Sequence, residues 1–390
     1  MMSKNSTLKM NLVFVYLVFV SLFFYSCERD SYGSVDDTNN IKNYAEYELE
    51  EQEFKLLKIV DGLNKPWGLT FTNEENVLIT EKGGRIIRVN LPSGRSFEVL
   101  HNIDSIEEGQ GGLLDILYHE GYLYFSYAQD KGSGKTTTSI SRGKLINDEV
   151  VGLELLFSAI PAIKSGKHFG CRLVIRDDML YATIGERGQG MIAQDPTQHP
   201  GSIIRINLNG SVPNSNPKFN GKSDWLPEIY QIGVRNPQGM ALSPTNDEIY
   251  ISNHGAKGGD FIGQIEFSGN FGWKVIGWGG VNYLGTKIGE GNPFDSRFNK
   301  PLITWVPSIA PSDIVFYKGK TFRDWDEDLL VTSLKYKMLL RLDFENDKII
   351  NETIITSGKI GRIRDVDIDV NGDIYLITDE YDSSLWKLTK

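Results

Sequence analysis

Apolar segments of strand length recur in pairs along residues 54–390, and a turn separates the two members of each pair. The segments are rich in aliphatic, aromatic and β-branched residues, which favour strands. The first members are WGLTF (67–71), LLDILY (113–118), RLVIRD (172–177), GMALSP (239–244), DIVFYK (313–318) and VDIDVN (366–371). The second members are VLIT (77–80), YLYFSY (122–127), LYATIG (180–185), IYISNH (249–254), LLVTSL (329–334) and IYLITD (374–379). The pattern therefore predicts repeated copies of one strand-turn-strand unit.

Six such units favour an all-β fold, a six-bladed β-propeller with antiparallel four-stranded blades. A β-sandwich would also contain short strands and turns, but it would not repeat the same unit six times. No segment with strong helical periodicity competes with this prediction. Because a propeller ring must close, we expect the C-terminal strand Leu385–Leu388 to pair with strands near the N-terminus. The predicted propeller spans residues 54–390.

Residues 1–26 have the features of a secretory signal peptide. Lys4 and Lys9 precede an apolar run over residues 12–25. That run is shorter than the roughly 20 residues that a membrane-spanning helix needs, and a charged start before such a run is typical of a signal peptide. The sequence therefore predicts an exported protein.

The run ends at Ser26-Cys27, which resembles a bacterial lipobox. We expect lipidation of Cys27, while cleavage by an ordinary signal peptidase with an incidental Cys27 is the alternative. Residues 28–53 are polar and acidic and are interpreted as a tether. The expected location is a bacterial membrane to which the protein is held by its lipid anchor, at the outer membrane facing the periplasm or at the cell surface.

Composition excludes some classes of function. The chain has 41 basic and 51 acidic residues and a formal net charge of −10, which argues against nucleic acid as a partner because phosphate binding needs a basic surface. Two cysteines could form at most one disulfide, so a disulfide scaffold is excluded. The 40 glycines are consistent with many tight turns.

Polar residues gather just before and just after the predicted strands, at positions that a propeller places at the mouth of its channel. The cations among them could converge on one anionic ligand, because guanidinium groups bind carboxylates through bidentate hydrogen bonds. A histidine there could act as a general base, and the carbonyl groups of the glycine-rich loop HGAKGG (254–259) would suit Ca²⁺. The candidates are Gln110, His168, Arg235, Asn236, Gln238, Lys335, Arg362 and Arg364.

Each candidate also has a purely structural explanation. His168 could be a structural histidine, and the side chain of Arg235 could cap carbonyl groups of its turn. Arg362 and Arg364, two residues apart and so on one face of a strand, could form a solvated surface. Lys335 could simply be exposed. Their recurrence at the ends of blades favours a shared site over these explanations.

The same residues lie in motifs that resemble those of the soluble quinoprotein sugar dehydrogenases, the PQQ-dependent glucose and aldose dehydrogenase family. The resemblance covers about residues 54–390 and implies a six-bladed propeller. The motifs are GQGGLLDILY (109–118), HFGCRL (168–173), YATIGERG (181–188), YQIGVRNPQGMAL (230–242), NHGAKGGD (253–260), SLKYK (333–337) and GRIRDVDIDVNGDIYLITD (361–379).

The resemblance implies a role for each candidate. His168 would be the catalytic base that takes the proton from the anomeric hydroxyl of an aldose while hydride passes to PQQ. Arg235 would lie against the reactive edge of PQQ and take part in catalysis. The main-chain carbonyls of Gly255 and Ala256 would bind Ca²⁺. An external electron acceptor would be the second partner. The remaining residues that would hold PQQ are Gln110, Asn236, Gln238, Lys335, Arg362 and Arg364.

Six positions depart from the family pattern. Phe261 and Gly263 stand where Glu and Asn are usual after Asp260, and Cys171 replaces a usual glycine. Ala256 replaces the usual proline, Glu186 replaces the usual Asp, and Lys167 precedes His168 where an acidic or amide residue is common. Lys167 is expected to lower the pKa of His168 by like-charge repulsion.

Two other functions are left open: a surface-anchored propeller binding module without catalysis, and a Ca²⁺-dependent lactonase, whose metal site would need carboxylate and amide side chains.

Overall fold

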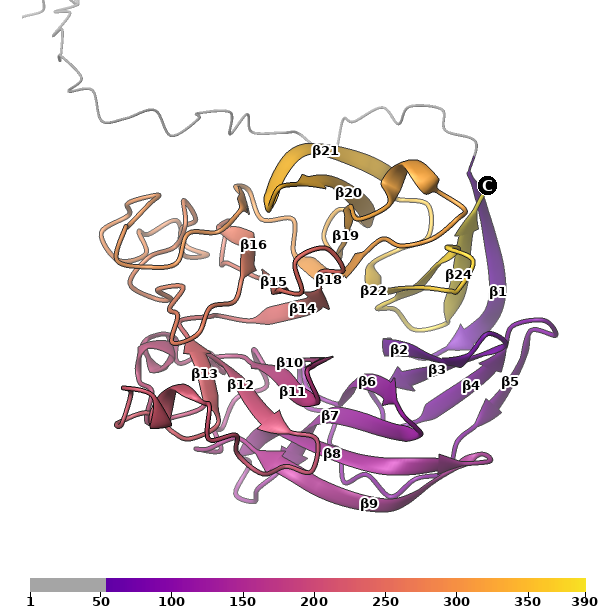
Figure 1. Cartoon of the computed structure of the whole chain (residues 1–390), viewed down its shortest axis with the longest axis horizontal. Coiled ribbons are helices and arrows are strands. Elements are labelled where there is room, and N and C mark those ends of the chain that lie inside the picture. Colours follow the sequence, from indigo (N-terminus) through magenta and orange to yellow (C-terminus); the bar gives the residue numbers. More distant parts are fainter. Residues whose placement is uncertain (1–53) are drawn as a thin grey trace, which may run out of the picture. The chain divides into compact units, whose positions relative to one another are not determined.

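The computed structural model describes residues 54–390, so the predicted signal peptide, Cys27 and the predicted tether lie outside the described residues. Residues 54–390 form six four-stranded antiparallel sheets arranged in a ring (Figure 1). The predicted all-β, six-bladed propeller is confirmed. The helices within this part of the chain are short 3₁₀ turns: η1 (Gly190–Gln194), η2 (Pro217–Phe219) and η3 (Arg323–Trp325). None of them is long and apolar enough to cross a membrane.

Five blades each consist of four consecutive strands, in order from the innermost to the outermost. Blade one contains β2 (Pro66–Asn73), β3 (Asn76–Glu81), β4 (Ile86–Asn90) and β5 (Arg95–Glu98). Blade two contains β6 (Leu113–His119), β7 (Tyr122–Asp130), β8 (Thr136–Ile146) and β9 (Glu149–Ser158). Blade three contains β10 (Gly170–Arg176), β11 (Met179–Ile184), β12 (Ser202–Asn207) and β13 (Ile229–Ile232). Blade four contains β14 (Pro237–Leu242), β15 (Ile249–Asn253), β16 (Asp260–Gln264) and β17 (Ile303–Trp305). Blade five contains β18 (Pro311–Phe316), β19 (Leu329–Ser333), β20 (Met338–Glu345) and β21 (Lys348–Ser357).

The sixth blade closes the ring with strands from both ends of the described chain. Its strands are β22 (Ile363–Ile368), β23 (Ile374–Thr378), β24 (Ser383–Thr389) and, outermost, β1 (Lys55–Leu63). Leu56 pairs with Leu388 in an antiparallel register, and β1 and β24 lie side by side in Figure 1. The expected closure by the C-terminal strand is confirmed, and it pairs the edge of β24 that would otherwise be free.

The hydrophobic core lies between neighbouring blades. Leu78 and Ile86 of blade one, for example, pack against Leu113 and Phe125 of blade two, and all four side chains are buried. Because both faces of a blade are covered by other blades, the strands read as nearly continuous apolar runs rather than as a strict alternation. The side chains of β3, β15 and β19 accordingly face the interior along most of their length.

In blades one to four, a hydroxyl residue near the end of the second strand ties that blade to the next. The Thr80 hydroxyl donates to the carbonyl of Leu114, and the Ser126 hydroxyl donates to the carbonyl of Cys171 at 2.5 Å. The same link is repeated from Thr183 to Pro237 at 3.1 Å and from Ser252 to Ser312 at 2.6 Å. A buried hydroxyl thus satisfies a main-chain carbonyl that the sheet of the neighbouring blade does not pair.

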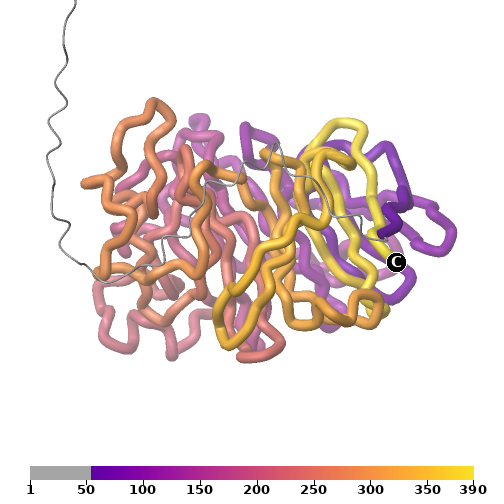
Figure 2. Tube along the Cα trace, turned by 90° about the horizontal axis from the view of Figure 1, so that it is seen from above, coloured from indigo at the N-terminus to yellow at the C-terminus, as the bar shows by residue number. Residues whose placement is uncertain are grey.

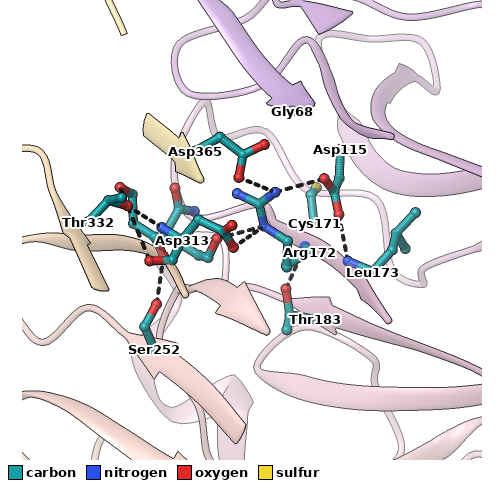
Figure 3. A network of polar contacts seen from close by, with 12 residues as sticks. Gly68, Asp115, Cys171, Arg172, Leu173, Thr183, Ser252, Asp313, Thr332 and Asp365 are labelled. Atoms are coloured by element: carbon teal, nitrogen blue, oxygen red, sulfur yellow. Dashed lines mark hydrogen bonds and ion pairs between the residues drawn. The ribbon is translucent and has the colours of Figure 1, made fainter. Parts of the chain in front are cut away.

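Four charged side chains on innermost strands meet at the centre of the ring and are named the hub: Asp115, Arg172, Asp313 and Asp365 (Figure 3). Arg172 Nη1 lies 2.8 Å from Asp115 and 2.9 Å from Asp365, and its Nε lies 3.1 Å from Asp313. All four side chains are buried. The hub therefore joins blades two, three, five and six by charge-assisted contacts.

The sheet register decides which residues share a face of the ring. Pro237 at the start of β14 pairs with Asn253 at the end of β15, and Ile363 pairs in the same way with Thr378. Residues just before an innermost strand and just after a second strand therefore lie together at one face. Figure 2 shows the ring from its side, with strands running between two faces that carry the connecting loops.

Candidate functional site

Most of the predicted site residues lie at this one face, and hydrogen bonds join them across blades. The main-chain N–H of His168, before β10, donates to Gln110 Oε1 of the preceding blade at 2.8 Å. The main-chain N–H of Glu186, after β11, donates to the carbonyl of Arg235 in the next blade at 2.8 Å. Arg364 Nη1 reaches across the ring to Gln238 Oε1 at 2.8 Å. These hydrogen bonds join residues of different blades into one connected site.

His168 forms a buried pair with Glu186. Its Nδ1 is hydrogen-bonded to Glu186 Oε1, and the other carboxylate oxygen of Glu186 accepts the main-chain N–H of Gly190. The carboxylate fixes the ring and its tautomer, so that Nδ1 carries the proton. Within residues 54–390, Nε2 has no hydrogen-bond partner. A histidine held at one nitrogen and free at the other is arranged to accept a proton.

The electrostatic surroundings keep this histidine neutral. Burial lowers the pKa of His168, the hydrogen bond to Glu186 raises it, and the charges of Arg235 and Lys167 lower it further, so that the pKa lies below its usual value. The expected effect of Lys167 is in this direction, but burial has the larger effect. Burial alone would raise the pKa of Glu186, and its bond to His168 holds it below the usual value. His168 is therefore a neutral base beside the ionised carboxylate of Glu186.

Asn236, Gln238 and the two arginines of the last blade form a second chain of contacts. Gln238 Nε2 donates to Asn236 Oδ1 at 3.2 Å, while Gln238 Oε1 accepts from Arg364. Arg364 Nη2 lies 2.7 Å from Asp379 Oδ2, and Arg362 Nη2 lies 3.6 Å from the same oxygen. Burial would raise the pKa of Asp379, but the two arginines hold it at about 2. Arg364 is buried, and Arg362 is more exposed.

Two cations of the site are buried without a carboxylate partner among residues 54–390. Arg235 is 4% exposed, and its guanidinium donates only to neutral groups, the carbonyl of His254 at 3.4 Å and the hydroxyl of Tyr283 at 3.2 Å. Lys82 donates to the carbonyl of Gly109 at 2.9 Å, and burial lowers its pKa. Because a buried cation is costly unless it is paired, these positions favour an anionic ligand.

Arg364 adds an observation of the same kind. Its Nε is buried and has no hydrogen-bond partner, and the same holds for Trp273 Nε1. The indole of Trp273 lies 5.4 Å from the guanidinium of Arg235. These two buried donors therefore lack a partner within the described residues, and a ligand with carboxylate or carbonyl oxygens would satisfy them.

Lys335 is exposed and lies at the margin of the site. Its Nζ donates to the carbonyl of Ser308 at 2.8 Å, and the hydroxyl of Ser308 donates to Asp260 at 2.6 Å. Asp260 also accepts the N–H of Gly255 at 2.7 Å. Lys335 is thus connected to the glycine-rich loop through Ser308 and Asp260, without a direct ion pair to that carboxylate.

The loop that carries Gly255 and Ala256 is folded tightly on itself. A Cβ at residue 255 would lie 2.2 Å from the carbonyl oxygen of Gly258, so only glycine fits there. Both Asp260 oxygens are occupied by donors of this region, and Asp260 is fully buried. The groups of the loop that a hard cation could use are therefore main-chain carbonyls. Within residues 54–390 no three His, Cys, Asp or Glu side chains are grouped so that they could hold a metal ion.

Sequence reasoning did not assign Lys82, Asp379, Tyr283 or Trp273 to the site. Lys82 and Asp379 directly follow the second strands of blades one and six, and Glu186 lies two residues after the second strand of blade three. Polar residues just after a second strand could therefore have been assigned to the site from the sequence. Tyr283 and Trp273 lie in the long connection after β16, and the path of that connection is not encoded in any repeat.

Comparison with known proteins assigns this propeller, with its histidine–carboxylate pair beside unpaired buried cations, to a class of oxidoreductases. The family model for Glucose / Sorbosone dehydrogenase matches residues 63–387. The chain belongs to this family.

Characterised relatives and a solved structure agree with the assignment. The chain is 32% identical to Aldose sugar dehydrogenase YliI of Escherichia coli (strain K12), over 84% of this chain and 91% of that protein. It is 29% identical to Quinoprotein glucose dehydrogenase B of Acinetobacter calcoaceticus, over 84% of this chain and 86% of that protein. The crystal structure of the soluble aldose sugar dehydrogenase from Escherichia coli in the apo-form matches with a TM-score of 0.81 and 30% identity, over 86% of this chain and 99% of that one.

Proposed function

We propose that this protein oxidises the anomeric hydroxyl of aldose sugars to lactones, with PQQ as the hydride acceptor, Ca²⁺ as an accompanying ion and His168 as the general base. The observation that carries the proposal is the placement of the His168–Glu186 pair beside Arg235, a buried cation without a carboxylate partner among residues 54–390. The names of the curated relatives, an aldose sugar dehydrogenase and a quinoprotein, support the substrate class and the cofactor.

The residues of the site fit a tricarboxylate quinone. Arg235, Lys82 and Arg364 offer charged donors, and Gln110, Asn236 and Gln238 offer neutral ones. Lys335 and Arg362 would add charge at the more exposed side. When bound, PQQ supplies a carbon that accepts hydride, and Ca²⁺ polarises the adjacent oxygen. The carbonyls of Gly255 and Ala256 are the proposed ligands of that ion.

The chain's own residues perform the proton transfer and the positioning. His168 Nε2 takes the proton of the sugar's C1 hydroxyl as the C1–H bond gives up its hydride, so the sugar loses two electrons and two hydrogens and becomes a lactone. Glu186 holds Nδ1–H and stabilises the imidazolium that forms. Arg235 supplies positive charge where negative charge develops on the hydride acceptor.

Reconstitution tests the proposal. Purified residues 28–390 are incubated with PQQ and Ca²⁺, PQQ binding is followed by calorimetry, and dye reduction is followed with glucose and other aldoses. We expect PQQ binding and dye reduction with at least one aldose. Absence of both would contradict the proposal and favour a propeller binding module, while lactone hydrolysis without dye reduction would favour a lactonase.

Arg364→Ala is expected to weaken PQQ binding about 10- to 100-fold, because a hydrogen bond to a charged group contributes roughly 1.5–3 kcal/mol. The affinity is measured by titrating the apoprotein with PQQ. Arg95→Ala, on the exposed strand β5, is the matched control and should bind like wild type. Equal affinity of the Arg364 variant would remove this residue from the cofactor site.

Glu186→Gln is expected to lower kcat about tenfold or more and to shift the pH profile. Glu186 raises the pKa of His168 against the effect of burial, so its neutral analogue lets that pKa fall further. The rise of kcat/KM with pH, which reports deprotonation of the base, then moves to lower pH. Glu186→Asp keeps the charge and should restore part of kcat. An unchanged profile in the Gln variant would mean that the pair does not control the base.

We also propose that the protein is exported and held on a membrane through a lipid on Cys27. The proposal rests on the charged and apolar pattern of residues 1–26 and on Cys27 at its end. A surface location would place the site where sugars and an external electron acceptor reach it without crossing the inner membrane.

A further inference from the structure

The connection between β16 and β17 takes an unusual path. In blades one and five the third and fourth strands are joined by short turns, between Asn90 and Arg95 and between Glu345 and Lys348, whereas in blade four residues 265–302 intervene. This segment returns to the face that carries the site. The N–H of Trp273 donates to the carbonyl of Gly233 at 3.0 Å, and Val281 accepts from the N–H of Lys257 at 2.9 Å.

The tip of this connection is an ordered hairpin. The N–H of Asn282 donates to the carbonyl of Thr286, and the N–H of Gly285 donates to the carbonyl of Asn282, both at 2.8 Å. Gly285 has a φ of +82°, the left-handed conformation that such a turn requires and that glycine adopts without strain. Because the base of the hairpin is paired with Lys257, in the loop that carries Ala256, the tip is held at the rim of the site.

Tyr283 projects from this hairpin to Arg235. Its hydroxyl accepts a hydrogen bond from Arg235 Nη2 at 3.2 Å, and its ring centre lies 5.8 Å from the guanidinium. The side chain is nevertheless 68% exposed. The oxygen is therefore fixed toward Arg235, while most of the side chain remains exposed to solvent.

We infer that Tyr283 is a specificity-determining residue whose exposed ring packs against the sugar held for oxidation at His168, an inference that rests on the proposed function. An aldopyranose presents an apolar face of C–H groups, and aromatic rings provide a matching flat apolar surface. The cations of the site match the charge of the anionic cofactor, so the exposed ring of Tyr283 is left for the neutral substrate. The bond to Arg235 preorganises the ring, so little entropy is lost when the sugar binds.

The test compares Tyr283→Ala and Tyr283→Phe with wild type in the PQQ-loaded full domain. Tyr283→Ala should raise KM for glucose at least tenfold and weaken binding of gluconolactone, measured by calorimetry, by a similar factor, while the affinity for PQQ changes less than about threefold. Tyr283→Phe keeps the ring and should keep KM within about threefold of wild type. The preference between glucose and xylose, which lacks the C6 group, should also change in the Ala variant.

Phe97→Ala is the matched control, since Phe97 is also an exposed aromatic ring with an arginine, Arg88, 5.0 Å from its centre, but on the outermost strand of blade one. An unchanged KM and lactone affinity in Tyr283→Ala would overturn the inference, as would a loss of PQQ affinity equal to the loss for sugar. If wild type binds no PQQ, the proposed function fails. The lactone titration of wild type against Tyr283→Ala then still decides whether the ring contacts sugar.

Discussion

His168→Ala is expected to lower kcat for aldose oxidation by about 10²- to 10⁴-fold, the usual contribution of a general base, while PQQ binds with unchanged affinity. The ring of His168 is fixed at Nδ1 by Glu186, and Nε2 has no partner within residues 54–390. Loss of the ring therefore removes a proton acceptor, whereas the cations proposed to hold the cofactor are left in place.

Single-turnover reduction of the bound cofactor measures the chemical step directly. His119→Ala is the control, because His119 ends β6, at the opposite end of the strand from the site, and should leave kcat unchanged. A variant at position 168 that retained a third or more of the wild-type rate would show that the base is another group. His254, whose carbonyl accepts from Arg235, is another candidate, but burial lowers its pKa to about 3, and its Nε2 is hydrogen-bonded to the carbonyl of Pro311 at 2.5 Å.

The fold could be predicted because the chain repeats one local pattern. Each of the six strand pairs forms the two inner strands of a blade, and the closing strand pairs where it was expected. The role of β1 was less visible, since KLLKIVDGL mixes charged and apolar residues on an outer strand that is only partly covered. Outer strands contact fewer neighbours, so their sequences are less constrained toward apolar residues.

Parts of the site could be predicted for the same reason. His168, Arg235 and Arg362 precede innermost strands, and a propeller brings such positions to one face whatever the length of the loops between them. The hydrogen bonds between Gln110 and His168 and between Arg364 and Gln238 follow from this geometry. Residue type together with strand position was sufficient information.

The remaining contacts depend on packing that no local pattern records. Tyr283 reaches Arg235 only because residues 265–302 return to the face of the site, and sequence separation gives no measure of that path. The pairing of His168 with Glu186 required the exact approach of two loops, although Glu186 stood out as a polar residue at a blade end. Long-range side-chain contacts of this kind are set by the whole fold.

The hub was visible in the sequence only as charges within apolar strands. Asp115 lies in LLDILY, Arg172 begins RLVIRD, and Asp313 begins DIVFYK. A charge in a strand that is buried on both faces needs a partner of opposite sign, so these three positions could have been matched to one another. Arg172 also contacts the ring of Trp67, and the centre of this ring lies 5.6 Å from the guanidinium of Arg364. The hub is therefore linked to the candidate site through Trp67.

Arg172→Met is expected to reduce the free energy of unfolding by about 3–5 kcal/mol, because it leaves buried carboxylates without their cation. Burial raises the pKa of Asp115 and Asp313, and the charge of Arg172 opposes that rise. Without Arg172 both pKa values increase further, so the folded variant binds more protons than the unfolded chain over a wider range. Its stability should therefore fall as pH rises from 5 to 8, and more steeply than that of wild type.

Chemical denaturation at pH 5 and pH 8 measures the effect, with Arg176→Met as the control at the other end of the same strand. Arg176 makes ion pairs with Asp247 and Glu248 that are open to solvent, so its loss should cost less than about 1 kcal/mol. Should Arg172→Met not fold at pH 8, the double variant with Asp365→Asn, which removes one uncompensated charge, is expected to recover part of the stability. If the two arginine variants lost equal stability at both pH values, the hub could not be the electrostatic centre that joins the blades.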